Sequence, residues 1–391
     1  MRPSSDTSES VSEVLSKGRQ TLSVVQFHRD EFTVKALAAG NNVQLMLEQI
    51  EQFHPHFVGM SSPDAAREIR EKHPEIIVVS GEEVNMLASL HEVDIVVNGV
   101  NGFAGLAPLI AALKAGKTVA LANKESIVCA HHVVNSILAE FGGKIIPVDS
   151  EQSAIFQCLS AGRREDVKRL VLTASGGMFR EFSKEELSKV TPEMALHHPT
   201  WSMGGKITID SSSMFNKGLE LMEAGWLFDF KPDSISILIH PQSVVHSMVE
   251  YIDGSMIAQL SRPDMRLAIQ YALTYPARIP SELPKFDLTK LSGLTFFEPD
   301  GEKFPAIPLA YAAFREGDSL PIAYNAANEV AVRYFVERKL SFTGIAACVE
   351  AVMNRIICGS RVDTIEKVYY LDGEARRVAE EFCSKHIGVD L

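Results

Sequence analysis

Between residues 31 and 151, short apolar runs alternate with segments whose apolar residues recur at helical spacing. Each apolar run ends in small or polar residues, and a helical segment follows it. This alternation predicts a doubly wound parallel sheet with helices on both faces. The apolar runs are EFTVKALAAG, HFVGM, EIIVVSG, VDIVVNGV, TVALANKES and GKIIPVDSE, which begin at residues 31, 56, 75, 93, 118 and 143.

The last of these runs ends abruptly in Asp149, Ser150 and Glu151. Ligands of open α/β sheets bind beyond the carboxyl ends of the strands. In an extended segment residues i and i+2 point the same way, so both carboxylates can face one oxygen-ligated cation of the Mg or Mn type. Alternatively, Asp149 and Ser150 only cap a helix that begins at the segment SAIFQCL, as Asp and Ser commonly do.

The other strand-like runs bring small and polar residues to the same edge of the predicted sheet. Glycines in such loops let the backbone approach a pyrophosphate, and the helix starts behind them favour anions. Loops of this kind are equally common as plain turns, and a lysine such as Lys124 is a surface residue in most proteins. The residues concerned are Gly40, Asn42, Asn123, Lys124, Glu125 and the loop at 98–102.

After about residue 160 the alternation fails, and the sequence predicts a mixed α+β region. The run VKRLVLTASGGMF delivers Ser175 and two glycines into a loop that suits phosphate oxygens or a simple turn. Residues 197–205 are too rich in Pro and Gly for a regular element. Because they include His198 and Trp201, they suggest a mobile flap over a site; the alternative is a surface loop with Trp201 in the core.

Residues 207–226 predict a capped amphipathic helix. Ser211 offers an N-cap, and an apolar stripe follows at spacings of three and four. The opposite face carries Asn216, Glu220 and Glu223, with Lys217 beside them. Lys217 and Glu220 are three residues apart, and we interpret them first as a solvated ion pair.

Composition excludes several classes of protein. The net charge of −12 argues against a surface for nucleic acid, although a local basic pocket for phosphate is compatible with it. No apolar run approaches the roughly 18 residues of a membrane span, and the start has no signal-peptide core. Five cysteines without a CxxC pair predict reduced thiols and a cytoplasmic location. They are Cys129, Cys158, Cys348, Cys358 and Cys383.

The remaining segments have simpler interpretations. SISILIHPQSVVHSMVEYIDGSMIAQL, from residue 234, predicts three strands with a hairpin turn at Asp253–Gly254. Residues 281–303 are rich in Pro and turn residues and predict a surface linker. The segments from residue 304 onward predict a small helical bundle. The polar first sixteen or so residues predict a disordered start or a frayed helix.

Several long motifs resemble, in order and spacing, 1-deoxy-D-xylulose 5-phosphate reductoisomerase. They are LANKES, PVDSEQSAIFQ, TASGGMFR, HPTWSMGGKITIDSSSMFNKGLELMEA, HPQSVVHSMVEYIDGSMIAQLSRPDMR and YNAANEVAV. The resemblance implies a V-shaped homodimer that isomerises a phosphosugar, 1-deoxy-D-xylulose 5-phosphate, and reduces it with NADPH to 2-C-methyl-D-erythritol 4-phosphate. The implied domains are a divergent start at 1–17, an NADPH domain at 18–148, a catalytic domain at 149–280, the linker at 281–303 and the helical domain at 304–391.

The resemblance also implies roles for particular residues. Asp149, Glu151 and Glu220 match the ligands of a divalent metal, Mg²⁺ or Mn²⁺ with Co²⁺ as a further candidate. Ser150 and Lys124 match contacts to the sugar backbone, and Lys124 is counted with the metal ligands as catalytic. Ser175, Ser211, Asn216 and Lys217 match the phosphate site, and His198 and Trp201 match the flap. Gly18, Gly40, Asn42, Asn123, Glu125 and Gly204 match cofactor contacts.

The sequence departs from the family at its start. The family opens with a strand and a G-x-T-G-S-I-G turn before T-L, but SVSEVLSKGRQ precedes Thr21 and Leu22 here. We therefore expect a sheet without its first strand, and either a misplaced start or frameshift or much weakened NADPH binding. Asn41 stands where a basic residue suits the 2′-phosphate of NADPH. The alternatives are a metal-dependent phosphosugar isomerase or lyase without a redox step, or an inactive homologue.

Overall fold

The fold is described from a computed structural model, which describes residues 10–196, 204–356 and 361–388. The expected flap residues His198 and Trp201 lie outside these ranges. The described chain forms two compact units. Unit 1 comprises the described parts of Met1–Asn123, Val134–Val148 and Met265–Pro284, and unit 2 comprises Lys124–Val133 and the described parts of Asp149–Asp264 and Lys285–Leu391.

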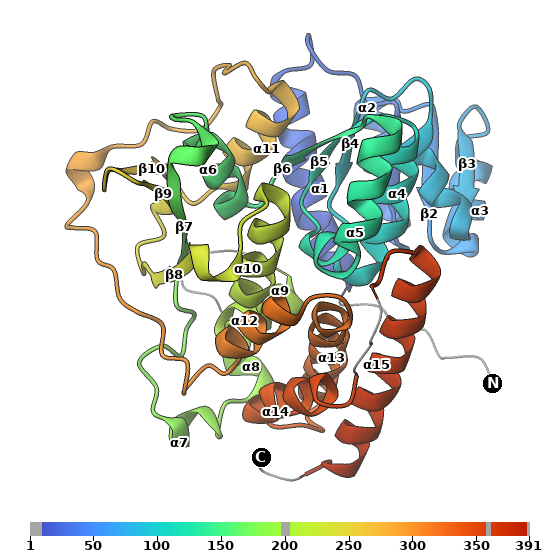
Figure 1. The fold of residues 1–391 in the computed structure, drawn as a ribbon. Helices are drawn as coiled ribbons and strands as arrows, with labels where there is room; N and C mark the ends of the chain where they lie inside the picture. The colour runs from blue at the N-terminus through green and yellow to red at the C-terminus, as the bar shows by residue number, and fades with distance from the viewer. Residues whose placement is uncertain (1–9, 197–203, 357–360, 389–391) are drawn as a thin grey trace. The chain divides into compact units, whose positions relative to one another are not determined.

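Unit 1 contains two parallel sheets of three strands each (Figure 1). In the first sheet Ala36 lies beside Phe57 and Phe57 beside Ile77. In the second sheet the register pairs Ile95 with Thr118 and Thr118 with Lys144. The strands of the first are β1 (Ala36–Ala39), β2 (Phe57–Met60) and β3 (Ile77–Ser80), and those of the second are β4 (Ile95–Asn98), β5 (Thr118–Leu121) and β6 (Lys144–Pro147).

The break between the two sheets lies where the first strand of a doubly wound sheet belongs. Among the described residues no strand precedes β1, and the segment before it is helix α1 (Ser10–Phe27). Each of β1 and β4 is hydrogen-bonded to a neighbouring strand on one side only. No residue of β1 is buried, whereas Val58 and Met60 of β2 are fully buried. The predicted parallel fold is confirmed, and within the described residues helix α1 stands where the sequence lacks the first strand.

Two groups of helical segments pack against the two sheets of unit 1. In the first group, α1 packs against β1 and against α11 (Met265–Thr274), which itself contacts β5 and β6. In the second group, the 3₁₀ segment η1 (Gly81–Ser89) contacts β1, β2, β3 and α4 (Leu106–Lys114). The other helical segments of unit 1 are α2 (Val43–Phe53), α3 (Pro63–Lys72) and η2 (Gly102–Gly105).

Unit 2 is built on a mixed four-stranded sheet in the order β10-β9-β7-β8. Strands β9 and β10 form the predicted hairpin, and β7 runs parallel to β8. The strands are β7 (Val167–Ala174), β8 (Ile235–Ile239), β9 (Val245–Tyr251) and β10 (Met256–Leu260). Its helices are α6 (Ser150–Leu159), α7 (Lys184–Leu187), α8 (Pro192–Ala195), α9 (Gly205–Ser212) and α10 (Phe215–Phe228), with short turns η3 (Arg164–Asp166), η4 (Pro232–Ser234) and η5 (Leu288–Lys290). Helix α5 (Lys124–Phe141) begins in unit 2 and ends in unit 1.

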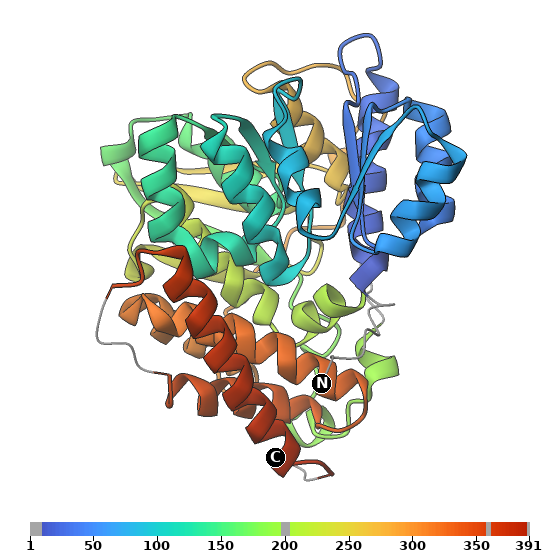
Figure 2. The same cartoon turned by 90° about the vertical axis from the view of Figure 1, so that its right-hand side faces the viewer.

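Four further helices of unit 2 form the predicted C-terminal bundle (Figure 2). Helix α13 packs against both α14 and α15, and α12 packs against α13 and α10. Two glycines of α10 permit this close approach. A Cβ at Gly225 would lie 1.9 Å from the ring of Phe314, and one at Gly218 would lie 2.0 Å from the Tyr324 hydroxyl. The bundle helices are α12 (Ala306–Glu316), α13 (Ser319–Val336), α14 (Phe342–Met353) and α15 (Ile365–Lys385).

Replacing Gly218 by alanine should destabilise the protein by about 1–3 kcal/mol, the usual effect of overpacking a core. The added methyl would meet Tyr324, which is fully buried and donates its hydroxyl hydrogen to the Ala306 carbonyl at 3.0 Å. Gly373 of α15 is the matched control, because a Cβ there meets nothing within 4 Å. Its alanine variant should gain up to about 1 kcal/mol from helix propensity. Urea unfolding checks both; equal stability of the two variants would contradict the packing argument.

The expected domain boundaries differ from these units in two places. The segment 149–280 is divided, because α11 packs against α1, β5 and β6 and therefore belongs to unit 1. The segment 281–303 is more than a linker, because Phe297 exchanges backbone hydrogen bonds with Ile239 of β8. At the start, residues 10–17 belong to α1, as the frayed-helix alternative expects.

Candidate active site

Three segments of unit 2 bring the predicted catalytic residues together. Asp149 is the N-cap residue of α6 and Glu151 lies in its first turn, directly after β6. Lys124 is the first residue of α5. Helix α10 presents the remaining residues at spacings of three and four, so that they share one face of the helix. They are Asn216, Glu220 and Glu223, with Lys217 next to them.

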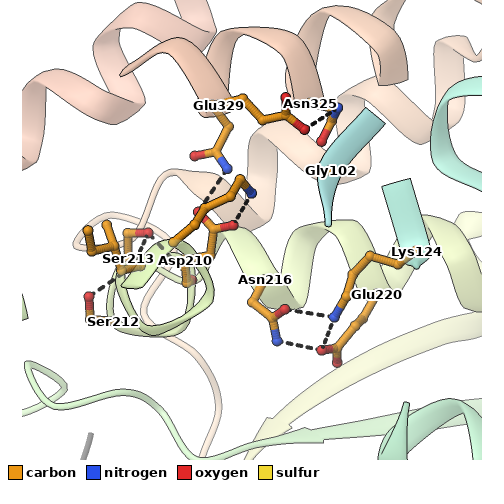
Figure 3. Close-up of polar contacts among 12 residues, drawn as sticks. Gly102, Lys124, Asp210, Ser212, Ser213, Asn216, Glu220, Asn325 and Glu329 are labelled. Atoms are coloured by element: carbon orange, nitrogen blue, oxygen red, sulfur yellow. Dashed lines mark hydrogen bonds and ion pairs between the residues drawn. The ribbon is translucent and has the colours of Figure 1, made fainter. Parts of the chain in front are cut away.

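The ammonium group of Lys124 lies among three partners, two of which, Asn216 and Glu220, are labelled in Figure 3. Its Nζ is 2.6 Å from Asp149 Oδ2 and 2.9 Å from Glu220 Oε1. It also donates a hydrogen bond of 2.7 Å to Asn216 Oδ1. The side chains of Lys124 and Glu220 are 4% and 2% exposed, so the surface-lysine alternative is wrong.

Lys217 is the second buried cation of this cluster. Its Nζ donates to Glu151 Oε1 at 2.8 Å and also contacts Glu220 Oε2. Ser150 donates a further hydrogen bond of 2.7 Å to Glu151 Oε2. The interpretation of Lys217 and Glu220 as a solvated pair is therefore wrong, because their side chains are only 4% and 2% exposed. Helix α10 packs against α6 and β8, and its Lys217 and Glu220 side chains are buried. The spacing of these two residues in the sequence does not reveal that burial.

Burial and charge shape the proton affinities of the cluster. Burial raises the pKa of Glu220 and of Glu223, and repulsion from neighbouring carboxylates adds to the effect. Burial opposes the charge of Lys124, but Asp149, Glu220 and Glu223 outweigh it and hold its pKa well above the ordinary value. Glu223 Oε2 is buried without a hydrogen-bond partner among the described residues. The cluster thus buries more acidic than basic groups, which costs free energy.

The donor set suits a divalent cation that prefers oxygen ligands. Asp149, Glu151 and Glu220 supply carboxylates, and a cation beside them would offset the excess of acidic groups. In the described part of the chain the two lysines lie between these carboxylates, and no three His, Cys, Asp or Glu side chains are arranged to hold a metal ion. The metal assignment of these three residues therefore stays a prediction.

The two serines of the predicted phosphate site come from segments in direct contact. Ser175 follows β7, and the loop after it turns through Gly176 and Gly177, both at positive φ. A Cβ at Gly177 would lie 2.8 Å from the Ser211 carbonyl oxygen, so this close approach requires glycine. Asn216 and Lys217 make their described polar contacts with the carboxylate cluster.

The predicted cofactor residues fall in both units. In unit 1, Asn42 accepts a hydrogen bond from Leu45 N as the cap of α2, and Asn123 donates to the Gly102 carbonyl at 2.8 Å. Gly40 follows β1 in a bend, whereas Gly18 lies inside helix α1. Amides in the body of a helix bond to their own helix, which does not fit the predicted cofactor contact of Gly18. In unit 2, Glu125 lies in the first turn of α5 and Gly204 is the N-cap of α9.

Sequence interpretation missed three buried polar residues near the cluster. The Gln152 amide donates to the Glu220 carbonyl oxygen at 2.9 Å and joins α6 to α10. Asp210 of α9 accepts from Asn328 of α13 at 2.8 Å and pairs with Lys206 one turn back. The Lys206–Asp210 spacing is visible in the sequence, but the bond to Asn328 joins residues 118 positions apart.

Three family models match the chain. They are described as 1-deoxy-D-xylulose 5-phosphate reductoisomerase (residues 16–131), its C-terminal domain (145–228) and a DXP reductoisomerase C-terminal domain (260–378). The 1-deoxy-D-xylulose 5-phosphate reductoisomerase of Chlorobium chlorochromatii is 49% identical over 368 residues, which cover 93% of this chain and 96% of the relative. The enzyme of Geotalea uraniireducens is 48% identical over 377 residues, which cover 95% and 96%.

Solved structures agree with these matches. A crystal structure of DOX-P reductoisomerase in complex with NADPH, fosmidomycin and magnesium is similar with a TM-score of 0.89 and 39% identity, over 94% of this chain and 96% of that one. A reductoisomerase structure from Zymomonas mobilis in complex with NADPH is similar with a TM-score of 0.87 and 39% identity, over the same shares.

Proposed function

Because this chain belongs to the 1-deoxy-D-xylulose 5-phosphate reductoisomerase family, we infer that it converts 1-deoxy-D-xylulose 5-phosphate to 2-C-methyl-D-erythritol 4-phosphate. The reaction rearranges the carbon skeleton and reduces the product with NADPH in the presence of a divalent metal, as the relatives that bind NADPH and magnesium indicate. The product feeds isoprenoid precursor synthesis. One observation assigns this function to particular residues: carboxylates and lysines from the start of α5, the start of α6 and α10 form a buried cluster.

The cluster supplies the groups that the rearrangement needs. Asp149, Glu151 and Glu220 are the proposed ligands of Mg²⁺, with Mn²⁺ or Co²⁺ as substitutes. When bound, the cation would draw electron density from the substrate carbonyl and offset the negative charge that develops during rearrangement. NADPH supplies the hydride.

Lys124 and Ser150 are the proposed contacts to the sugar backbone. Lys124 is held in place by Asp149, Glu220 and Asn216, and a substrate oxygen would replace one of these three acceptors. Burial keeps water away from this charge and strengthens its interactions. We propose that Lys217, Asn216, Ser175 and Ser211 hold the phosphate, whose remote binding energy orients the reacting carbons.

Incubation of the chain with 1-deoxy-D-xylulose 5-phosphate, Mg²⁺ and NADPH tests this function. Absorbance follows NADPH oxidation, and NMR identifies the product. We expect one 2-C-methyl-D-erythritol 4-phosphate for each NADPH oxidised, and a chelator should stop the reaction. Rearranged aldehyde without NADPH oxidation would instead support an isomerase, and no reaction at all would support a non-catalytic homologue.

Replacing Lys217 by alanine should raise the KM for the phosphorylated substrate about 10- to 100-fold, because a hydrogen bond to a charged group contributes about 1.5–3 kcal/mol. The KM for 1-deoxy-D-xylulose, which lacks the phosphate, should change little. Steady-state kinetics with the two sugars measures both. An unchanged KM for the phosphorylated sugar would leave Lys217 as an ion-pair partner of Glu151 and Glu220 only.

We propose that two chains associate through β10, one of the two edge strands in the described unit 2 sheet. An edge strand offers unpaired backbone groups to a second chain. Ile252, Met256 and Ile257 of the hairpin are 66%, 45% and 39% exposed, so the edge also carries apolar surface. Light scattering should give twice the chain mass of 43.0 kDa, and a single-chain mass would contradict this proposal.

We also propose a cytoplasmic location. Cys129, Cys158, Cys348 and Cys383 are buried free thiols, and the Sγ atoms of the last two are 3.7 Å apart, which suits a reducing compartment. Within the described ranges, no helix combines the length and the apolar character needed to cross a membrane.

A further inference from the structure

The segment YNAAN at the centre of α13 is polar in sequence but completely buried. Tyr324, Asn325 and Asn328 are all 0% exposed. Burying an amide is unfavourable unless it is hydrogen-bonded, so such residues need partners of their own. The partner of Asn325 is Glu329 on the same helix, at 3.2 Å, whereas the partner of Asn328 lies on another helix.

Asn328 reaches from the bundle to α9. Its Nδ2 donates a hydrogen bond of 2.8 Å to Asp210 Oδ1, and Asp210 Oδ2 lies 2.5 Å from Lys206 Nζ on the preceding turn. Asp210 is 2% exposed and directly precedes Ser211. The Asp210 carboxylate therefore joins Lys206 at the start of α9 to Asn328 in the bundle. The next residue along the chain, Ser211, belongs to the proposed phosphate site.

The backbone of Ser211 itself contacts a second segment, the loop after β7. The backbone of Gly177 approaches the Ser211 carbonyl so closely that a Cβ there would lie 2.8 Å from it. Helix α10 follows after two residues, and its Gly218 faces Tyr324 of the same α13 segment. The α13 segment thus contacts both helices that carry the proposed phosphate residues, and Asn328 provides the polar contact to α9.

The chemistry at this contact requires a neutral donor on α13. The carboxylates of Asp210, Glu125 and Glu329 surround Lys206 and outweigh its burial, so its pKa lies above the ordinary range. A second carboxylate at position 328 would face Asp210 with like charge in a buried site, which is strongly unfavourable.

We propose that Asn328 is a positioning residue of this enzyme: by holding Asp210 it fixes the Ser211 end of α9 and so the phosphate site. This inference rests on the proposed phosphate site. It assigns to the YNAAN segment of the bundle a role in substrate binding without direct contact to the substrate.

Asn328→Asp tests the proposal, with Asn325→Asp as the matched control. Both substitutions place a carboxylate on the same buried helix beside another carboxylate, but only the first faces α9. We expect Asn328→Asp to raise the KM for 1-deoxy-D-xylulose 5-phosphate about 10- to 100-fold, as misplacement of binding groups by about 1 Å can do. Asn325→Asp should lower the Tm but leave the KM unchanged. The double variant Asp210→Asn with Asn328→Asp exchanges the donor and the acceptor, so its KM should fall back most of the way to that of the unmodified chain.

An unchanged KM in folded Asn328→Asp, an equal rise in Asn325→Asp, or no recovery in the double variant would each overturn the proposal. If Asn328→Asp does not fold, Asn328→Ala removes the donor without adding charge, and the same KM rise is expected. Lys217→Ala in the same assay distinguishes failure of the proposed Asn328 role from failure of the proposed phosphate site. If it raises the KM while the Asn328 variants do not, only the positioning role fails; if it too has no effect, the phosphate site itself is wrong.

Discussion

Replacing Glu220 by glutamine should abolish turnover and leave the fold intact. Glutamine keeps the shape and one oxygen of Glu220 but removes its negative charge from the proposed metal site. We expect kcat/KM to fall at least about 10³-fold, or ~4 kcal/mol. Lys124 keeps Asp149 as a partner and Lys217 keeps Glu151, so the Tm should change little.

The matched control is Glu223→Gln, one turn further along α10. Glu223 is not one of the proposed metal ligands, and burial raises its pKa well above its ordinary value. Its activity should therefore fall far less than that of Glu220→Gln. Turnover at several Mg²⁺ concentrations measures both variants. Full activity of Glu220→Gln with an unchanged Mg²⁺ requirement would refute the triad of Asp149, Glu151 and Glu220.

Restoring a β-strand and a G-x-T-G-S-I-G turn before Thr21 should tighten NADPH binding at least about 100-fold, or ~3 kcal/mol. The turn would offer backbone amides to the pyrophosphate, which α1 does not, because its amides are engaged within the helix. The strand would also pair with the open sides of β1 and β4, which lack a neighbour there among the described strands.

Calorimetric titration of NADPH into the two chains measures this difference. A third chain, with the strand restored but the turn glycines replaced by alanine, separates sheet repair from the amide cradle. We expect it to unfold at higher temperature than the 391-residue chain while binding NADPH weakly. Equal, tight binding by the original and the restored chain would show that the departure at the N-terminus has no consequence for the cofactor.

Much of the fold follows from local pattern. The alternation of apolar runs and helical segments predicts the parallel strands, because period and turn residues are local signals. The hairpin at Asp253–Gly254 follows from its turn chemistry. The interruption between β1 and β4 also follows, since a missing strand in the sequence leaves its two neighbours without a partner.

The parts that sequence did not predict depend on contacts between distant segments. The partition of α11 into unit 1 depends on packing against β5 and β6, which lie far from it along the chain. The burial of Lys124 and Lys217 requires α5, α6 and α10 to meet, so each lysine alone resembles a surface residue. The Asp210–Asn328 bond has no local signal for the same reason.

The most direct test of this account is the steady-state rate of the 391-residue chain and of the strand-restored chain at increasing NADPH. The proposed catalytic cluster lies intact in unit 2, whereas the proposed cofactor unit, unit 1, has two separate sheets among the described strands. We therefore expect both chains to reach the same kcat, within about threefold, and the KM for NADPH to be at least about 100-fold higher in the original chain. A lower kcat that saturating NADPH does not restore, or equal KM values for NADPH, would contradict this account.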